Sequence, residues 1–304
     1  MDRNNAARVS ASPMAQGEYA RPLLLGLIGA GIQKSRTPAM HELEGAHHGL
    51  RIAYTLIDLE ELGTGPEALP ELLRAAELMG FAGLNITHPC KQAVIPLLDG
   101  LSPEARALGA VNTVLLRDGR RMGHNTDWSG FAAAFEAEMA DAPRRHVVQL
   151  GAGGAGSAVG FAALKLGAGR LSIVDALPER AAHLAAQLNR NFDGGRAVAV
   201  PDAGAALAAD GLINTTPIGM TGHPGMPLAE AWLRPSLWVA DIIYFPLETE
   251  LLAAARGLGC RTLGGGGMAV FQAVEAFRLF TGLEPDARRM RQSFTELGET
   301  PRRE

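Results

Sequence analysis

The sequence predicts an α/β protein with two domains, each built around a largely parallel sheet. The chain has 304 residues, which is more than one hydrophobic core usually serves. From Leu23 onward, short apolar runs alternate with longer segments of helical periodicity. After a predicted helix from Trp128 to Met139, the alternation begins again with an apolar run at His146. This restart indicates a second α/β unit.

Composition places the chain among globular proteins and excludes several classes of partner. Hydrophobic residues make up 47% and charged residues 20% of the chain, which is ordinary for a packed enzyme. The net charge is -4, and Lys and Arg are scattered, so no nucleic acid partner is expected. Apolar runs such as Leu23 to Ile28 are much shorter than a membrane span, so no membrane partner is expected either.

Cysteine and histidine usage argues against a disulfide framework and against a metal site. Cys90 and Cys260 are too few for either a disulfide framework or a four-thiolate zinc site. The histidines lack metal-ligand spacing. We therefore expect a cytoplasmic protein without a metal. Residues 1–21 are polar and Ala-rich and are expected to form a flexible extension rather than a signal peptide.

The first unit is predicted to begin as βαβαβ and to continue with a hairpin. β-branched or leucine-rich runs predict its strands, and apolar residues at helical spacing predict its helices. Thr37-Pro38 indicates the start of a helix, with Thr37 as the N-cap. Asp118-Gly119 is a strong turn dipeptide between two short strands. The predicted strands are Leu23 to Gly29, Ile52 to Leu59, Gly83 to Thr87, Val111 to Arg117 and Arg121 to Asn125, and the predicted helices are Thr37 to about Gly49 and Pro66 to Gly80.

The second unit repeats the alternation of strands and helices. Its predicted strands are His146 to Leu150, Leu171 to Asp175, Gly211 to Asn214 and Leu237 to Tyr244, and its predicted helices are Gly156 to Leu166 and Pro178 to Asn189. Four successive glycines, Gly264 to Gly267, indicate a hinge or a close approach to a ligand. A final helix from Met268 to Phe280, with Gly282 as its stop, has no strand after it, so it is free to return to the first domain.

A glycine-rich turn in the second unit predicts a dinucleotide site. Gly151-Ala152-Gly153-Gly154-Ala155-Gly156 comes directly after a strand and opens a helix. The first glycine permits a tight turn, the second lets the backbone approach a pyrophosphate, and the third allows close packing of helix on strand. The helix N-terminus attracts the anion. We therefore predict that Gly151, Gly153, Gly154 and Ala155 contact the cofactor.

Asp175 ends the next predicted strand, where a carboxylate accepts hydrogen bonds from the adenosine ribose hydroxyls and would repel a 2′-phosphate. This favours NAD over NADP, although Arg180 on the following helix could reach a phosphate. Asp175 could equally be an N-cap of that helix. A competing match, Gly29-Ala30-Gly31 with Asp58, lacks the third glycine because Lys34 stands there, so we exclude it as a dinucleotide site.

Small polar residues gather at the predicted ends of the first unit's strands, where open α/β sheets bind ligands. Hydroxyls, amides, one amine and one carboxylate suit a polyhydroxylated acid, since each ring hydroxyl needs a partner once water is excluded. The clusters are Ser35-Arg36-Thr37-Pro38, Asn85-Ile86-Thr87-His88-Pro89-Cys90-Lys91, Gly109-Ala110-Val111-Asn112-Thr113 and Asn125-Thr126-Asp127. Taken singly, Lys91 could be an ordinary first-turn lysine and Asp127 an N-cap.

These clusters, the glycine loop and Gly-Met-x-x-x-Gln at Gly267 to Gln272 occur in the same order in shikimate dehydrogenases. The chain resembles that family from about residue 22 to 290. The resemblance implies two α/β domains around a cleft: a substrate domain at 22–127 and a doubly wound Rossmann domain at 128–266. Residues 267–304 would then be C-terminal helices that return to the substrate domain. It also implies a dehydrogenase of a cyclic polyhydroxy acid.

By position, Lys91 and Asp127 resemble the family's catalytic pair. The residues that resemble its substrate ligands are Ser35, Thr37, Asn85, Thr87, Asn112 and Gln272, and Tyr244 is a further candidate. Gln272 is selected only by the resemblance. Further candidates for cofactor contact are Thr215, Pro217, Gly265 and Met268.

Two features look like the NAD-dependent branch that oxidises quinate as well as shikimate. Thr37 stands where many biosynthetic members have Ser, and Asp175-Ala176-Leu177 replaces the Asn-Arg-Thr type of NADP enzymes. The resemblance therefore implies oxidation of quinate or shikimate with NAD, in which Lys91 takes the hydroxyl proton and Asp127 relays it or orients the amine. The alternatives are an NADP-dependent biosynthetic shikimate dehydrogenase, a folate dehydrogenase-like enzyme and a non-catalytic sensor. A homo-oligomer is left open.

Overall fold

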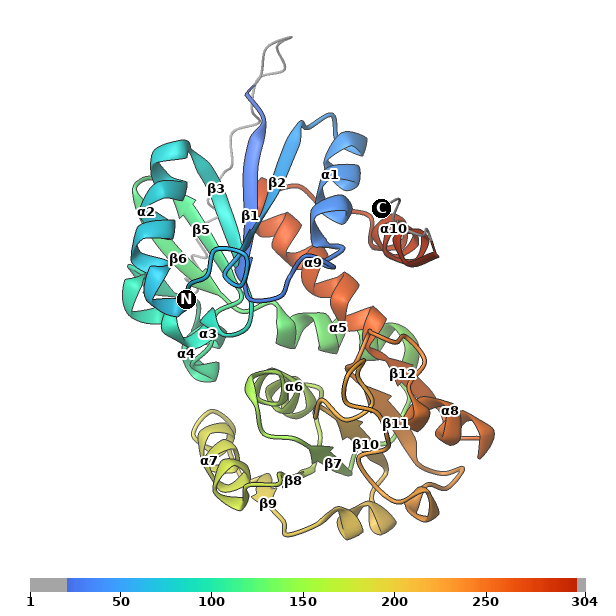
Figure 1. The fold of residues 1–304 in the computed structure, drawn as a ribbon. Helices are drawn as coiled ribbons and strands as arrows, with labels where there is room; N and C mark the ends of the chain where they lie inside the picture. The colour runs from blue at the N-terminus through green and yellow to red at the C-terminus, as the bar shows by residue number, and fades with distance from the viewer. Residues whose placement is uncertain (1–20, 300–304) are drawn as a thin grey trace, which may run out of the picture.

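The computed structural model describes residues 21–299, which form two six-stranded sheets, so the predicted α/β class is confirmed (Figure 1). The first sheet is mixed and has the order β2-β1-β3-β5-β6-β4. Strands β1, β2 and β3 are mutually parallel, and the hairpin β5-β6 joins β3 antiparallel. Its strands are β1 (Leu23–Gly29), β2 (Ile52–Asp58), β3 (Phe81–Ile86), β4 (Gly100–Leu101), β5 (Thr113–Arg117) and β6 (Arg120–His124).

The second sheet is parallel throughout and has the order β12-β11-β10-β7-β8-β9. Parallel strands with helical crossovers are buried on both faces, which explains why β10 and β11 are buried along their whole length. Its strands are β7 (His146–Leu150), β8 (Arg170–Val174), β9 (Ala197–Ala199), β10 (Gly211–Asn214), β11 (Trp238–Asp241) and β12 (Thr262–Gly264). Strands β8 and β9 lie on one side of β7, and β10, β11 and β12 lie on the other.

Helices cover both sheets and connect them. They are α1 (Thr37–His47), α2 (Leu69–Met79), α3 (Cys90–Ala93), α4 (Pro103–Leu108), α5 (Asp127–Met139), α6 (Gly154–Lys165), α7 (Pro178–Asn189), α8 (Glu250–Gly257), α9 (Gly265–Thr281) and α10 (Ala287–Glu299). Short 3-10 turns lie at Pro66–Ala68, Ile95–Leu97, Ala203–Ala208 and Glu230–Trp232. Within residues 21–299, no helix combines the length and apolarity that crossing a bilayer requires.

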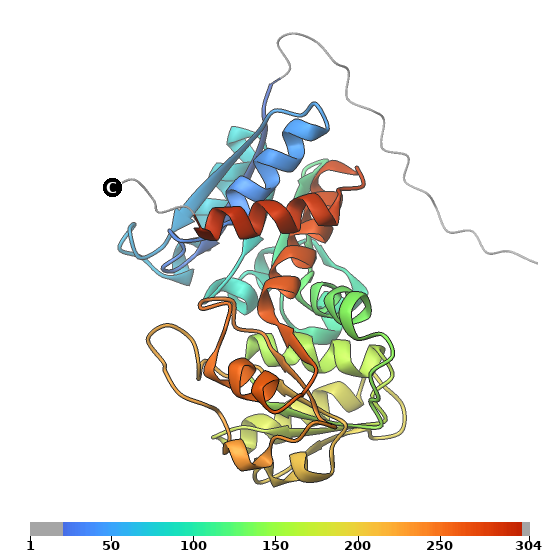
Figure 2. The same cartoon turned by 90° about the vertical axis from the view of Figure 1, so that its right-hand side faces the viewer.

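Two long helices tie the sheets together. Phe131 and Phe135 of α5 lie in the core of the second sheet, whereas Phe280 of α9 packs on the first, where a Cβ on Gly83 would lie 2.4 Å from its ring. The two helices cross so closely that a Cβ on Gly130 would lie 2.7 Å from the backbone nitrogen of Gln272. Figure 2 shows α10 lying across this region, beside α1 and α9.

Several details differ from the sequence prediction. Thr37 does not cap α1: Arg36 occupies the cap position with helical dihedrals, and no side chain caps the helix. Helix α6 begins at Gly154 rather than Gly156, since the glycine turn already has helical hydrogen bonding there. Three strands were too short for a periodic signal (β4, β9 and β12), and α8 and α10 were not predicted as separate helices. The predicted extension at residues 1–20 lies outside the described residues.

Candidate active site

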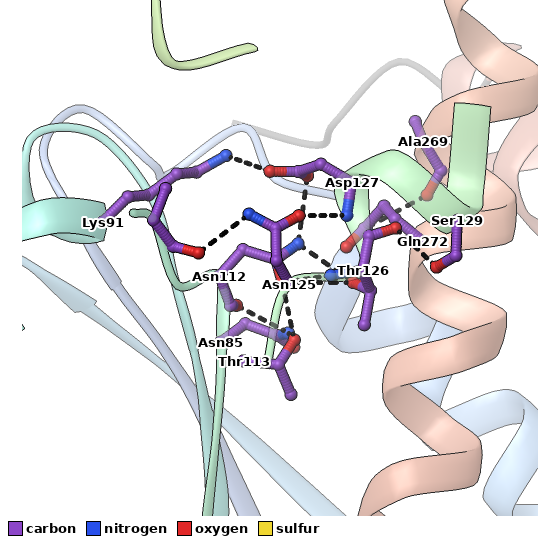
Figure 3. Close-up of polar contacts among 11 residues, drawn as sticks. Asn85, Lys91, Asn112, Thr113, Asn125, Thr126, Asp127, Ser129, Ala269 and Gln272 are labelled. Atoms are coloured by element: carbon purple, nitrogen blue, oxygen red, sulfur yellow. Dashed lines mark hydrogen bonds and ion pairs between the residues drawn. The ribbon is translucent and has the colours of Figure 1, made fainter. Parts of the chain in front are cut away.

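Lys91 and Asp127 meet at the carboxyl edge of the first sheet. Lys91 lies on α3, after β3, and Asp127 is the first residue of α5, shortly after β6. The Lys91 Nζ donates to Asp127 Oδ2 at 2.7 Å (Figure 3). Their side chains are 25% and 11% exposed, so the pair is largely screened from water and can still be reached from one side. Asp127 is not an N-cap, because Thr126 precedes it at the cap position of α5.

Asn112 holds the second oxygen of the Asp127 carboxylate. Its Nδ2 donates to Asp127 Oδ1 at 3.0 Å and to Thr126 Oγ1 at 2.9 Å, while its Oδ1 accepts from the Thr126 backbone N–H at 2.7 Å. Asn125 contributes from the other side, since its Oδ1 accepts from the Asp127 backbone N–H at 3.0 Å. With both carboxylate oxygens bonded, the orientation of the Asp127 side chain is determined by Lys91 on α3 and by Asn112, which directly precedes β5.

Asn85 is enclosed beneath this pair rather than open to a ligand. It is 4% exposed, accepts from the Tyr54 hydroxyl at 2.7 Å, and donates to Thr113 Oγ1 at 3.1 Å and the Asn112 carbonyl at 3.3 Å. Sequence reasoning missed Tyr54, because a tyrosine inside a strand is interpreted as a core residue. It included Thr113 in a polar cluster but did not predict its contact with Asn85. Through this network Asn85 supports Asn112. A direct contact between Asn85 and the substrate stays a prediction from the sequence.

Four of the remaining candidate ligands lie on three segments of the chain. Ser35 and Thr37 are partly exposed at the start of α1, where Ser35 Oγ accepts from the Thr37 backbone N–H at 3.3 Å. Thr87 is partly exposed just after β3. Gln272 lies on α9 against the start of α5, and its Nε2 donates to the Ala269 carbonyl at 3.1 Å (Figure 3).

Tyr244 reaches the same pair from the second half of the chain. It follows β11, and its hydroxyl interacts electrostatically with Lys91, Asp127 and Arg36. The residue as a whole is 44% exposed. Burial around the hydroxyl nevertheless raises the pKa of Tyr244, while Lys91 and Arg36 oppose that rise and Asp127 adds to it. The segment that follows β11 therefore brings Tyr244 near the Lys91–Asp127 pair.

The glycine turn at that edge has the geometry of an anion cradle. Gly151 has φ +97°, a conformation that side chains rarely adopt, and a Cβ on Gly156 would lie 2.6 Å from the Gly151 carbonyl. A Cβ on Gly153 or Gly154 would meet nothing within 4 Å, so open space lies above the turn. No side chain caps α6, which leaves the N–H groups of its first turn, including that of Ala155, available to a phosphate. These residues fit a dinucleotide.

Neighbouring strand ends surround the turn. Asp175 follows β8 and accepts from the Ala152 backbone N–H at 2.7 Å and from that of Leu177 at 3.0 Å, so it braces the turn. It is not the N-cap of α7, a position that Leu177 occupies. Thr215 Oγ1 donates to the Leu150 and Gly151 carbonyls, at 2.8 and 2.9 Å. Arg180 is exposed on α7.

The other three candidates follow β10 and β12. Pro217 is exposed in the segment after β10. Gly265 is buried at the start of α9, where a Cβ would lie 2.2 Å from the Ile242 carbonyl, and Met268 follows on the same helix. In contrast, the excluded glycine pair after β1 is closed by Asp58, whose oxygens accept from the backbone N–H groups of Gly31 and Ile32, both at 2.9 Å.

Comparison with known proteins identifies the family of this two-sheet arrangement. Residues 27–114 match the shikimate dehydrogenase substrate binding domain, and residues 265–293 match the shikimate 5'-dehydrogenase C-terminal domain. A "Shikimate dehydrogenase (NADP(+))" of Streptomyces avermitilis is 60% identical over 290 residues, covering 94% of this chain and 98% of the relative. The chain belongs to the shikimate dehydrogenase family. It is therefore an oxidoreductase that acts on a CH–OH group.

Other members of the shikimate dehydrogenase family differ in the cofactor for which they are named. A "Quinate/shikimate dehydrogenase (NAD(+))" of Corynebacterium efficiens is 52% identical, covering 90% of this chain and 98% of the relative. The solved quinate dehydrogenase of Corynebacterium glutamicum in complex with NAD superposes with a TM-score of 0.87 at 49% identity, covering 90% of this chain and 99% of that one. Family membership thus leaves the choice between NAD and NADP to the residues of this chain.

Proposed function

We propose that this family member oxidises a ring hydroxyl of quinate and of shikimate, reversibly and with NAD, to 3-dehydroquinate and 3-dehydroshikimate. The observation that carries the reaction is the 2.7 Å contact between Lys91 Nζ and Asp127 Oδ2, whose side chains remain 25% and 11% exposed. Each hydroxyl of a polyhydroxylated acid needs a polar partner once water is excluded. Ser35, Thr37, Thr87 and Gln272 supply such groups, and Tyr244 supplies one from the second sheet.

In the proposed reaction the substrate hydroxyl lies against Lys91 and Asp127. A nicotinamide cofactor held at the glycine turn, Gly151 to Gly156, would supply the hydride acceptor for the ring carbon. The Lys91 ammonium first gives a proton to Asp127 Oδ2, 2.7 Å away, and the neutral amine so formed accepts the hydroxyl proton. Asp127 then passes its proton to solvent. Asn112 keeps the carboxylate in position through its 3.0 Å bond to Oδ1, so the pair does not have to reorganise during the transfer. The partial exposure of the pair, 25% and 11%, leaves a route for the proton to solvent.

The preference for NAD rests on Asp175. Its carboxylate follows β8 at the place where the ribose of a dinucleotide lies, and a 2′-phosphate there would meet a negative charge. The adjacent residues, Ala176 and Leu177, provide no cation. NAD-named relatives with 50–52% identity are consistent with this reading. Asp175 also braces the glycine turn through Ala152, so the same carboxylate would support both the loop and the ribose.

A second candidate is an NADP-dependent shikimate dehydrogenase, which the 60% identity to the Streptomyces protein favours. Arg180, exposed at the start of α7, would then bind the 2′-phosphate. A folate enzyme and a non-catalytic sensor have less support, because they need neither the Ser35 and Thr37 hydroxyls nor the Lys91–Asp127 pair.

Initial rates of the purified full chain with quinate and shikimate, each with NAD and with NADP, test the proposal. We expect turnover of both acids and a higher kcat/KM with NAD. Higher kcat/KM with NADP on shikimate alone would assign the biosynthetic activity instead. Absence of turnover with all four combinations would overturn the proposal.

A further inference from the structure

Arg36 lies between two phenyl rings at the edge of the candidate active site. Its guanidinium carbon lies 4.7 Å from the ring centroid of Phe245 and 4.6 Å from that of Phe294. Its Nη1 also donates to the Phe294 carbonyl at 2.8 Å. A guanidinium over an aromatic face is attracted by the ring quadrupole, and more strongly when it is partly desolvated. Arg36 is only partly exposed, so two such contacts hold it firmly.

These contacts join three segments that are distant in the sequence. Arg36 directly precedes α1 in the first half of the chain, Phe245 follows β11 of the second sheet, and Phe294 lies on α10. Helix α10 in turn lies beside α1 and α9 (Figure 2). The guanidinium is therefore a direct link between the first sheet's ligand edge and the loop that carries Tyr244.

The segment 242–249, which we term the Tyr244 loop, is held at its two ends by Asp241. Asp241 Oδ1 accepts from the Ile243 backbone N–H at 3.1 Å, and Oδ2 accepts from Thr249 Oγ1 at 2.8 Å. Asn214 donates to the same carboxylate at 3.1 Å. The middle of the loop contacts the first half of the chain through Arg36 and Phe245.

Tyr244 lies next to Phe245, and its orientation depends on the same cluster. Its ring centroid lies 5.0 Å from that of Phe245 and 6.4 Å, edge to face, from that of Phe294. The Tyr244 hydroxyl and Arg36 interact electrostatically, an interaction that opposes the lowering of the Arg36 pKa by burial. The hydroxyl also interacts with Lys91 and Asp127, as described above.

We propose that Arg36 is a positioning residue: clamped by Phe245 and Phe294, it holds the Tyr244 loop so that the Tyr244 hydroxyl faces the Lys91–Asp127 pair and the substrate bound there. The proposal deepens the proposed function and rests on it. Arg36 acts through Tyr244, so its loss changes recognition of the acid and leaves cofactor binding and the proton-transferring pair intact. The planar guanidinium is required, because a lysine ammonium cannot stack on two rings while donating to a carbonyl.

A double-mutant cycle tests the coupling. We expect Arg36→Ala to raise KM for the acid about tenfold or more, the size of one lost hydrogen bond to a charged group, with KM for NAD unchanged. We expect Arg36→Lys to rescue less than half of this effect. In a Tyr244→Phe background, Arg36→Ala should add less than about threefold, because coupled residues are not additive. Full additivity in this cycle would overturn the proposal.

Arg196 is a matched control within the second half of the chain. Its guanidinium lies 5.4 Å from the Phe192 centroid and donates to the carbonyls of Leu164 and Ala168, the same two kinds of contact that Arg36 makes. We expect Arg196→Ala to lower Tm without raising KM for the acid. If Arg36→Ala behaves in the same way, Arg36 is only structural and the inference is wrong.

Hydrogen exchange separates a failure of this inference from a failure of the proposed function, since it needs no turnover. In the free full chain, we expect peptides covering residues 242–249 to exchange faster in Arg36→Ala than in the parent or in Arg196→Ala. Unchanged exchange in that segment contradicts the clamp even if the enzyme oxidises quinate. Faster exchange in a protein that oxidises neither acid keeps the clamp and rejects the substrate assignment.

Discussion

The ammonium of Lys91 and the carboxylate of Asp127 form an ion pair at 2.7 Å although 36 residues separate them and they lie on different helices. The first turn of α3 supplies one partner and the first residue of α5 supplies the other. Strands β3 and β6, which lie on either side of β5 and run in the same direction, bring these helix starts to one edge of the first sheet. Asn112, which directly precedes β5, completes the arrangement by bonding the second carboxylate oxygen.

Replacement of Lys91 by Ala is expected to lower kcat for quinate and shikimate about 10²–10⁴-fold, the usual contribution of a positioned acid or base. Binding of NAD, measured by fluorescence titration, should change less than twofold. Lys165→Ala is the control, since that lysine is exposed at the end of α6 and lies over Phe161. Asp127→Asn should lower kcat as well, and comparison of the two variants divides the proton transfer between the residues. Near-normal turnover of Lys91→Ala would falsify the assignment.

Replacement of Asp175 by Ser should shift cofactor choice toward NADP. The change removes a negative charge from the ribose site, while the hydroxyl can still accept from the Ala152 backbone N–H as the carboxylate does at 2.7 Å. We expect the ratio of kcat/KM with NADP to that with NAD to rise at least about tenfold, which corresponds to roughly 1.4 kcal/mol. Asp193→Ser, at an exposed position after α7, should leave the ratio unchanged. An unchanged ratio in Asp175→Ser would show that another group selects the cofactor.

Stability is expected to decline in mild acid because of His41. The ring is fully buried against Tyr54, Phe277 and Phe280, its Nδ1 bonds the Thr37 carbonyl at 2.9 Å, and burial lowers its pKa from 6.5 to about 4. Between these two values the unfolded chain binds a proton that the folded chain does not. The free energy of unfolding therefore falls as pH decreases from about 6.5 to 4, by about 3 kcal/mol from this group.

Urea unfolding at pH 7 and pH 4.5 measures the effect. His41→Met removes the titrating ring at similar volume, so the variant should lose less stability in acid than the parent. His47→Met is the control, because His47 lies exposed on the same helix. Equal acid dependence in the parent and in His41→Met would mean that other groups are responsible.

Gly130→Ala should disturb the crossing of α5 and α9. The added Cβ would lie 2.7 Å from the Gln272 backbone nitrogen and 2.9 Å from the Met268 carbonyl, so α9 must move. We expect a loss of about 1–3 kcal/mol in unfolding free energy and a higher KM for the acid, because Gln272 moves with its helix. At Gly257, by contrast, nothing lies within 4 Å of an added Cβ. Gly257→Ala should leave Tm and KM unchanged, and equal effects of the two substitutions would argue against the tight crossing.

Local patterns in the sequence were sufficient for the strands other than β4, β9 and β12, for most of the helices and for the glycine turn. A buried strand can be recognised from its own run of apolar residues. The tight turn after β7 requires a positive φ at Gly151, which a glycine adopts without strain. The polar residues at the strand ends could likewise be predicted from the sequence, since their order matches that of the shikimate dehydrogenases. Helix α8 was missed because its eight residues are too few for a clear helical period. Helix α10 was expected only as part of the C-terminal helices that the resemblance implies.

The sequence by itself determined the fold class, the enzyme family and the residue types that line the candidate site. Only the tertiary structure decided that Asn85 supports Asn112 from a buried position, that Tyr54 holds Asn85, and that Arg36 is stacked on rings from α10 and the Tyr244 loop. The physical reason is distance along the chain. Propensity and periodicity depend on residues a few positions apart in the chain. A hydrogen bond or a stacked ring between remote segments instead depends on how the two sheets and their helices pack.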